Sequence, residues 1–314
     1  MEYAKILVNQ VTIMFLLLMV GYILYKIKVI SDHTNQQLTS IVLYVVIPAM
    51  ILDTYQMDYD KAEATNMLLG FGLSLISIMI GILISYLLKF KAKKESLVTD
   101  RFCVIFTNCG FMAIPLISAI FGKLGVFYCN TYLTVFNIII WTYGIVLMRN
   151  QKDKKEKRTF FERIKPFITP TMVCIILGLS MYFLGIKLPS PVAKATEYVA
   201  SMNTPLAMIV SGVYIAQSDL LSAIKKLRVY YIVILKSFIV PFAVIAVFAF
   251  IPSDQMLRLA ILISAACPTA STAMLFANKY GGDVERASNV FTICTLMSII
   301  SLPIVILIAQ IFMH

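Results

Sequence analysis

The chain has 314 residues, of which 60% are apolar and 14% are charged, and its mean hydropathy is +0.87. A soluble domain cannot bury that much apolar surface, so the composition excludes a soluble protein and indicates an all-α polytopic membrane protein. The net charge of +11 is compatible with nucleic-acid binding, but the basic residues cluster in short loops between apolar segments. We therefore expect the lipid bilayer, and no nucleic acid, as a partner.

Ten apolar segments are long enough for membrane-spanning helices, which take about 20 residues each. In chain order they lie at 7–26, 37–55, 66–88, 102–122, 126–148, 167–185, 192–217, 229–251, 257–278 and 287–312, and we number them 1 to 10. Segment 1 has no small-residue cleavage site after it, which predicts an uncleaved helix. The cysteines lie within the segments without metal-ligand spacing, so we expect no metal site, no cofactor and no disulfide framework.

The basic residues assign sides to the loops. Alternate loops, starting with the one after segment 1, hold 20 of the 27 Lys and Arg residues. Because such loops stay in the cytoplasm, the bias predicts ten spans with both termini outside. The Ile/Lys-rich composition and the short loops indicate the plasma (inner) membrane. The polar stretch 151–165 is predicted to be a basic cytoplasmic linker between a first half, 1–150, and a second half, 166–314. Contact with lipid head groups is an alternative role for it.

The two halves resemble each other weakly. Segment 2 has VVIPAMIL around Pro48, and segment 7 has MNTPLAMIV around Pro205. FGKLG after segment 4 pairs with ANKYGG in segment 9, and VFN with VFT, at offsets of about 155–157 residues. An odd number of helices per repeat turns the second copy upside-down, as in many secondary transporters. Chance similarity between apolar helices is the alternative.

Helix-breaking residues interrupt segments 4 and 9. Segment 4 contains NCGFMAIPL, with Asn108, Gly110 and Pro115, and segment 9 contains CPTASTAM, with Pro268. In lipid, breaks survive only within protein or beside a water-filled cavity. We therefore predict that each segment consists of two half-helices of about ten residues, with Pro115 starting the second half of segment 4.

Inverted repeats bring the N-termini of these second half-helices together at the midplane. Each N-terminus carries unpaired N–H groups and about half a positive charge, which suits a carboxylate. The predicted substrate-binding residues are Asn108, Cys109, Gly110, Ala113, Pro115, Cys267, Pro268, Thr269, Ser271, Thr272 and Lys236, supported by Pro48, Pro205, Asn137 and Asn289.

Each of these residues also has a structural interpretation. A single proline commonly only kinks a membrane helix, Asn108 alone fits an interhelical hydrogen bond of about 1 kcal/mol, and Cys267 fits simple packing. The pairing of two broken segments at corresponding positions is what favours a site. Lys236 is the one basic residue well inside a segment, and it either faces the anion site or extends back to the membrane surface.

Motifs of enzymes and ATP-driven pumps are absent from the sequence. The two histidines, His33 and His314, lie outside the segments, and there is no HExxH motif, P-loop or nucleophile elbow. We therefore expect no enzymatic activity.

Taken together, these motifs resemble the auxin efflux carrier family, which includes the plant PIN-formed carriers and bacterial malate or malonate permeases. Asn108 with FMAIPLI is similar to the family's break in helix 4, and Pro268 with FANKYGGD is similar to its helix-9 pattern. Lys236 followed by Pro241 resembles its helix-8 pattern, and the similarity covers essentially the whole chain. The long hydrophilic loop of the plant carriers is absent, and Ala113 and Ala273 replace a glycine and a proline, which bears on the substrate.

This resemblance implies ten helices in two inverted repeats, a bile-acid-carrier or NhaA-like fold, and an elevator-like movement of organic anions bound where helices 4 and 9 cross. Export of a small carboxylate, as a uniporter or with protons, is our main hypothesis, and the assembly can be a homodimer. The alternatives are sodium-coupled uptake, with Thr269, Ser271 and Thr272 among the ligands, and a receptor that binds an anion without moving it.

Overall fold

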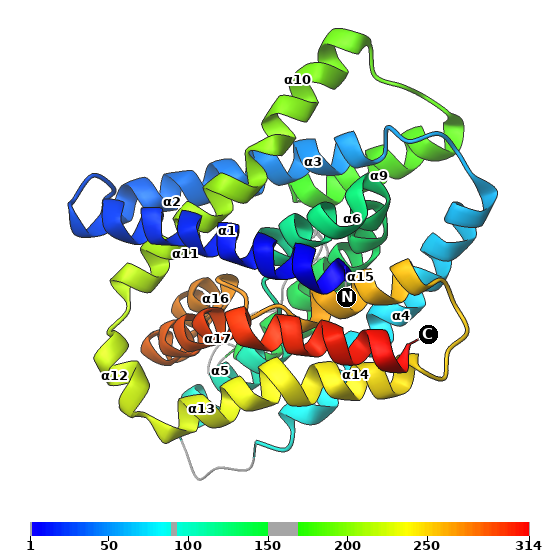
Figure 1. Cartoon of the computed structure of the whole chain (residues 1–314). Helices are drawn as coiled ribbons and strands as arrows, with labels where there is room; N and C mark the ends of the chain where they lie inside the picture. The colour runs from blue at the N-terminus through cyan, green and yellow to red at the C-terminus, as the bar shows by residue number, and fades with distance from the viewer. Residues whose placement is uncertain (1, 89–92, 150–168, 314) are drawn as a thin grey trace, which may run out of the picture.

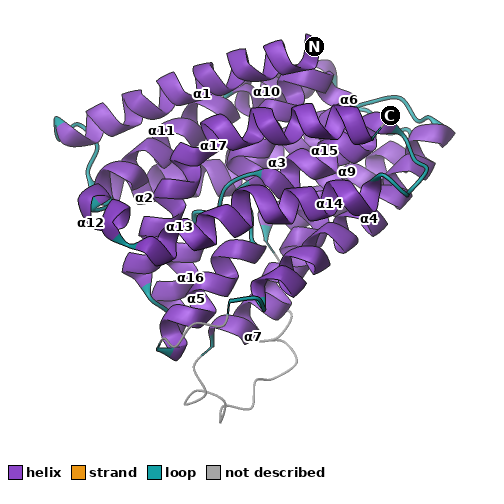
Figure 2. Cartoon of the chain, turned by 60° about the horizontal axis from the view of Figure 1, so that its bottom comes forward, coloured by secondary structure: helices purple, strands orange, loops and turns teal. Residues whose placement is uncertain are grey.

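The computed structural model describes residues 2–88, 93–149 and 169–313. The predicted linker 151–165 lies outside the described residues. The described chain is helical throughout, apart from one isolated bridge between two extended segments (Figures 1 and 2).

The first part of the chain contains α1 (Glu2–Lys26), α2 (Asp32–Ile41), η1 (Val42–Val46), α3 (Ile47–Thr54), α4 (Lys61–Ser85), α5 (Lys94–Ile105), η2 (Cys109–Ala113), α6 (Ile114–Ile139), η3 (Ile140–Gly144) and α7 (Ile145–Met148). The second part contains α9 (Pro170–Leu184), α10 (Ser190–Ser201), α11 (Asn203–Gln217), α12 (Leu220–Lys225), α13 (Leu227–Ile234), η6 (Leu235–Ile239), α14 (Val240–Phe248), α15 (Gln255–Ala266), α16 (Thr272–Tyr280) and α17 (Val284–Phe312). The elements labelled η are π-helical turns.

Seven helical stretches of the described residues are long and apolar enough to cross a membrane. They are Ile6–Lys26, Asp32–Thr54, Lys61–Ser85, Cys109–Met148, Ser190–Gln217, Leu227–Phe248 and Val284–Phe312, and Pro170–Leu184 and Gln255–Ala266 are shorter apolar helices. The chain is therefore a polytopic all-helical membrane protein. The count of ten spans stays a prediction.

The 40-residue stretch Cys109–Met148 turns back on itself at Gly122, whose φ of 62° is tolerated best by glycine. A Cβ built on Gly125 would lie 3.3 Å from the carbonyl oxygen of Ile117. Residues eight apart in a straight helix are about 12 Å apart, so the chain before and after Gly122 forms two adjacent helices. These correspond to the second half of segment 4 and to segment 5.

Three π-helical turns each end two residues before a proline, namely Pro48, Pro115 and Pro241. A proline cannot donate a backbone hydrogen bond, and its ring clashes with the carbonyl group four residues earlier. In the wider π turn, the residue before the proline donates its backbone N–H to the carbonyl group five residues earlier, as Ile114 does to Cys109. These prolines therefore widen a continuing helix. Pro205, by contrast, lies in the first turn of α11, after a break at Met202.

The helices pack in two groups. Helices α1, α2–α3, α9 and α10–α11 pack on one another and form what we call the α1 group. Helices α4–α7 and α13–α17 form the second, which we call the crossing group because it contains both broken segments. Figure 1 shows α1 beside α11, and their contact is the most extensive in the α1 group. A Cβ on Gly212 of α11 would lie 2.0 Å from the carbonyl oxygen of Leu18, so only glycine permits this approach.

A buried charge cluster ties α5 to α13 and α17 within the crossing group. Asp100 is fully buried, and its carboxylate lies 2.5 Å from Arg228 Nη2 and 3.5 Å from Arg286 Nη1. Burial raises the pKa of Asp100 to about 6, while the two guanidinium groups oppose that rise.

Candidate substrate site

Segments 4 and 9 are both interrupted, and their extended chains pair with each other. Helix α5 ends at Ile105 and α15 ends at Ala266. Between the breaks, the backbone N–H of Asn108 donates to the carbonyl of Pro268 at 2.8 Å. Two backbone breaks that would be costly in lipid therefore satisfy each other.

Two threonines reinforce this crossing of extended chains. Thr107 and Thr269 face each other in an antiparallel bridge. The hydroxyl of Thr269 donates to the carbonyl of Cys103 at 2.8 Å, which satisfies an acceptor in the last turn of α5. Thr269 therefore holds the crossing together and does not line the cavity described below.

Two helix N-termini begin at the crossing. Asn108 is the N-cap of η2 and Ser271 is the N-cap of α16, and neither side chain caps its own helix. The first N–H groups of a helix have no partner within the helix and carry its positive end. The crossing thus presents two positive helix ends, as the inverted pattern predicts.

A cavity of about 160 Å³ adjoins these helix ends, and we call it the crossing cavity. Its lining includes six of the predicted residues: Asn108, Cys109, Gly110, Asn137, Ser271 and Thr272. Asn108 is 5% exposed, and its amide nitrogen has no hydrogen-bond partner among the described residues. Asn137 instead donates to the carbonyl of Leu133 in its own helix at 2.8 Å. Of the two asparagines in the lining, Asn108 is therefore the one whose amide nitrogen lacks a partner among the described residues.

The crossing cavity also has a largely apolar wall, made of residues that were not among the predicted site residues. Aromatic residues contribute much of it: Tyr44, Phe111, Phe136, Trp141 and Phe276. Thr39, Leu43 and Ile47 follow one face of α2–η1–α3 at intervals of four residues, a spacing that is visible in the sequence. No charged side chain of the described residues lines this cavity.

Lys236 lies beside the crossing but outside the crossing cavity. It is fully buried, so it does not extend to the membrane surface, and its ammonium group donates to the carbonyl of Ala265 at 3.5 Å. Ala265 lies in the last turn of α15, where the helix dipole is negative. A cation at this position stabilises the C-terminal end of α15, the first half of segment 9.

Pro115 does not start a half-helix, contrary to the prediction. The helix begins six residues earlier at Cys109, because the pairing of Asn108 with segment 9 fixes where the extended chain ends. Pro115 lies outside the crossing cavity and lines a second cavity further along α6.

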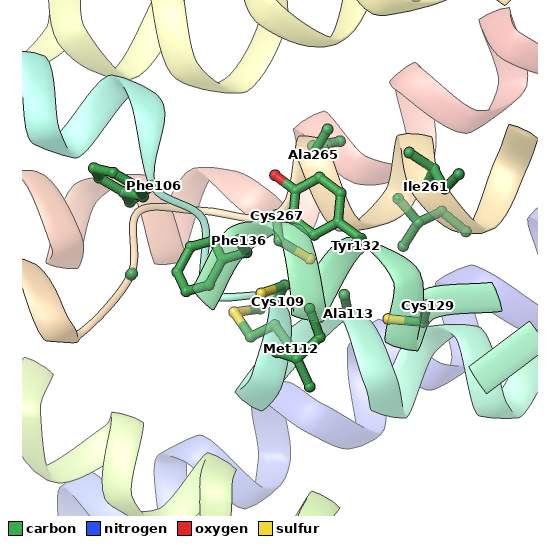
Figure 3. Close-up of a cluster of buried hydrophobic side chains, with 14 of the residues drawn as sticks. Phe106, Cys109, Met112, Ala113, Cys129, Tyr132, Phe136, Ile261, Ala265 and Cys267 are labelled. Atoms are coloured by element: carbon green, nitrogen blue, oxygen red, sulfur yellow. The ribbon is translucent and has the colours of Figure 1, made fainter. Parts of the chain in front are cut away.

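The remaining predicted residues do not line the crossing cavity, and all of them except the half-buried Pro205 are buried. Ala113 and Cys267 belong to the apolar cluster shown in Figure 3, and Cys109 lies beside them. Pro268 contributes its carbonyl oxygen to the backbone pairing. Pro48, Pro205 and Asn289 also lie outside the crossing cavity, and the amide nitrogen of Asn289 has no partner among the described residues.

Comparison with known proteins assigns the family. A model of the family described as "Membrane transport protein" matches residues 6–306. The chain belongs to this family. The match confirms the resemblance to the auxin efflux carriers. An uncharacterized transporter of Methanocaldococcus jannaschii is 23% identical over 305 residues, which cover 93% of this chain and 95% of that protein. The protein is therefore a membrane transporter and not an enzyme.

Proposed function

We propose that this member of the membrane transport family is a secondary transporter of small organic anions and binds the carboxylate at the crossing. The observation that carries the proposal is that two uncapped helix N-termini adjoin one cavity whose described lining has no charged side chain. Such helix ends bind carboxylates through N–H groups and the helix dipole. Asn108 would donate a further hydrogen bond from its unpartnered amide.

The cavity also bears on the class of acid. At 10–15 Å³ per water, about 160 Å³ accommodates roughly 11–16 waters, which suits a small organic acid. Its aromatic wall favours an acid with one carboxylate and an apolar body. A second carboxylate, as in malate or malonate, would be desolvated against that wall without a cation to pair with.

The architecture that we propose is ten spans in two inverted repeats of five, with the basic loops in the cytoplasm. The proposed movement is elevator-like, with the crossing group sliding along the α1 group. The position of the cavity supports this movement, because its lining combines Thr39 and Tyr44 of the α1 group with Asn108 and Ser271 of the crossing group. Sliding one group along the other would change the side from which the carboxylate is accessible. Export is the proposed direction, following the family resemblance.

A flux screen in proteoliposomes tests the proposal. Radiolabelled malate, malonate and indole-acetate would be supplied with and without sodium and proton gradients. We expect saturable flux of at least one acid above that of empty vesicles, without a requirement for sodium, and indole-acetate ahead of the dicarboxylates. Binding without flux would indicate an anion receptor instead, and strict dependence on sodium would indicate symport of the bile-acid-carrier type.

A further inference from the structure

A second cavity, of about 200 Å³, lies at the other end of the interface between the two helix groups. We call it the Lys123 cavity. Helices α3, α10 and α11 supply one wall, and α6 supplies the other. Its polar lining residues are Asp53, Thr54, Ser118, Lys123, Glu197, Ser201, Asn203 and Thr204. Unlike the crossing cavity, it therefore carries charged side chains.

The two cavities lie along the same pair of helices. On η1–α3, the lining of the crossing cavity ends at Ile47 and that of the Lys123 cavity begins at Met50. On η2–α6, the corresponding residues are Phe111 and Ile114. Three residues of helix span about 4.5 Å, so less than one helical turn of apolar side chains separates the cavities on both walls. A ligand that passes this barrier from the crossing cavity enters the Lys123 cavity.

The Lys123 cavity contains both a cation and an unpartnered buried amide. The ammonium group of Lys123 lies 2.9 Å from Asp53 Oδ1, so a carboxylate of the protein already occupies the position of an anionic ligand. Asn203 is 3% exposed, and neither of its amide atoms has a hydrogen-bond partner among the described residues. The second acidic residue of the lining, Glu197, pairs with Lys194 at 2.9 Å, which balances its charge.

We propose that the Lys123 cavity is a second carboxylate site, which the substrate occupies after it passes the barrier. Lys123 pairs with the substrate carboxylate in exchange for Asp53, and Asn203 donates a hydrogen bond to it. Because Lys123 belongs to the crossing group and Asp53 to the α1 group, the same exchange breaks an ion pair between the groups. The identity of the ligand as the transported acid rests on the proposed function.

Cysteine protection tests this site directly in the full-length protein. Ser118 is an exposed residue of the lining, so Ser118→Cys in a Cys174→Ser background gives a reactive thiol there, while the other five cysteines are buried. We expect saturating indole-acetate or acetate to slow maleimide labelling at least threefold. Lys123→Gln should abolish the protection. The matched control Lys61→Gln, which changes an exposed lysine outside the lining that pairs with none of the lining residues in the described structure, should retain it.

Two further variants separate this proposal from its alternatives. Asp53→Asn frees Lys123 from an exposed ion pair. It should lower the concentration of acid that gives half of the maximal protection against labelling, by up to about fivefold. Asn108→Ala should leave the protection unchanged, because it alters only the crossing. Absence of protection, equal protection by chloride, or loss of protection in Asn108→Ala would overturn the proposal. If the acid protects the thiol but the protein shows no measurable flux, the second site is supported and the proposed transport function is rejected. Thermal melting of each variant shows whether it is folded.

Discussion

Removing the amide of Asn108 should weaken carboxylate binding without disturbing the crossing. The side chain is buried beside the cavity and its amide nitrogen has no partner, whereas its backbone N–H makes the bond to Pro268. A hydrogen bond to a charged group contributes about 1.5–3 kcal/mol. At about 1.4 kcal/mol per factor of ten, Asn108→Ala should raise the Kd of the transported acid roughly 10- to 150-fold. Equilibrium binding of the radiolabelled acid to purified protein measures this change.

Asn137→Ala is the matched control, because it removes the same kind of side chain from the same cavity. The Asn137 amide already donates to Leu133, so we expect its Kd to stay within about threefold of the wild type. Asn108→Asp places a carboxylate beside the bound anion. At about 4 Å and an effective dielectric constant of about 20, the repulsion is about 4 kcal/mol, which should abolish measurable binding. Equal effects of the two alanine variants, or a wild-type Kd for Asn108→Ala, would refute the assignment of Asn108.

Three further predictions concern the surroundings of the site. Lys236→Met should weaken anion binding at least tenfold in the same assay. Even about 10 Å from the bound anion, a positive charge contributes about 1.7 kcal/mol at an effective dielectric constant of about 20. An unchanged Kd would contradict this prediction. Gly212→Ala should lower the melting temperature strongly, because its Cβ would overlap a carbonyl oxygen of α1. The control Gly72→Ala has open space around it and should be neutral or slightly stabilising. Equal melting temperatures of the two variants would contradict the close packing of α1 and α11. The folded-state pKa of Asp100 is raised from 3.8 to about 6, so its contribution to stability is present below pH 4 and is lost as the pH rises through 6. The stability of the wild type relative to Asp100→Asn should therefore fall by about 2 kcal/mol between pH 4 and 7, and a flat difference in thermal melts would contradict it.

The sequence was sufficient to locate the two breaks because helix breakers act locally. Asn108, Gly110 and Pro268 lie in or beside the interrupted stretches, and the polar residues after Pro268 mark the start of α16. The starting residue of the second half of segment 4 was predicted wrongly, at Pro115. It depends on backbone bonds to a segment about 160 residues away, and no local pattern contains that information.

The apolar wall of the crossing cavity was not predicted, because it depends on which face of α2–η1 packs toward the crossing. Tyr44 and Trp141 are ordinary lipid-compatible residues in the sequence, and only tertiary packing brings them to the cavity. The environment of Lys236 has the same origin. Its sequence position left two orientations open. Complete burial beside α15 excludes the one toward the membrane surface, and Lys236 also lies outside the lining of the crossing cavity.

The central claim is that the crossing carries a carboxylate through the membrane, and substrate counterflow tests it most directly. Proteoliposomes preloaded with an unlabelled acid that is active in the flux screen would be diluted into a trace of the labelled acid. We expect wild-type vesicles to accumulate label transiently above equilibrium, and Asn108→Ala vesicles to show little or no accumulation at the same acid concentration. Wild-type accumulation no greater than that of empty vesicles, or full accumulation with Asn108→Ala, would contradict the claim.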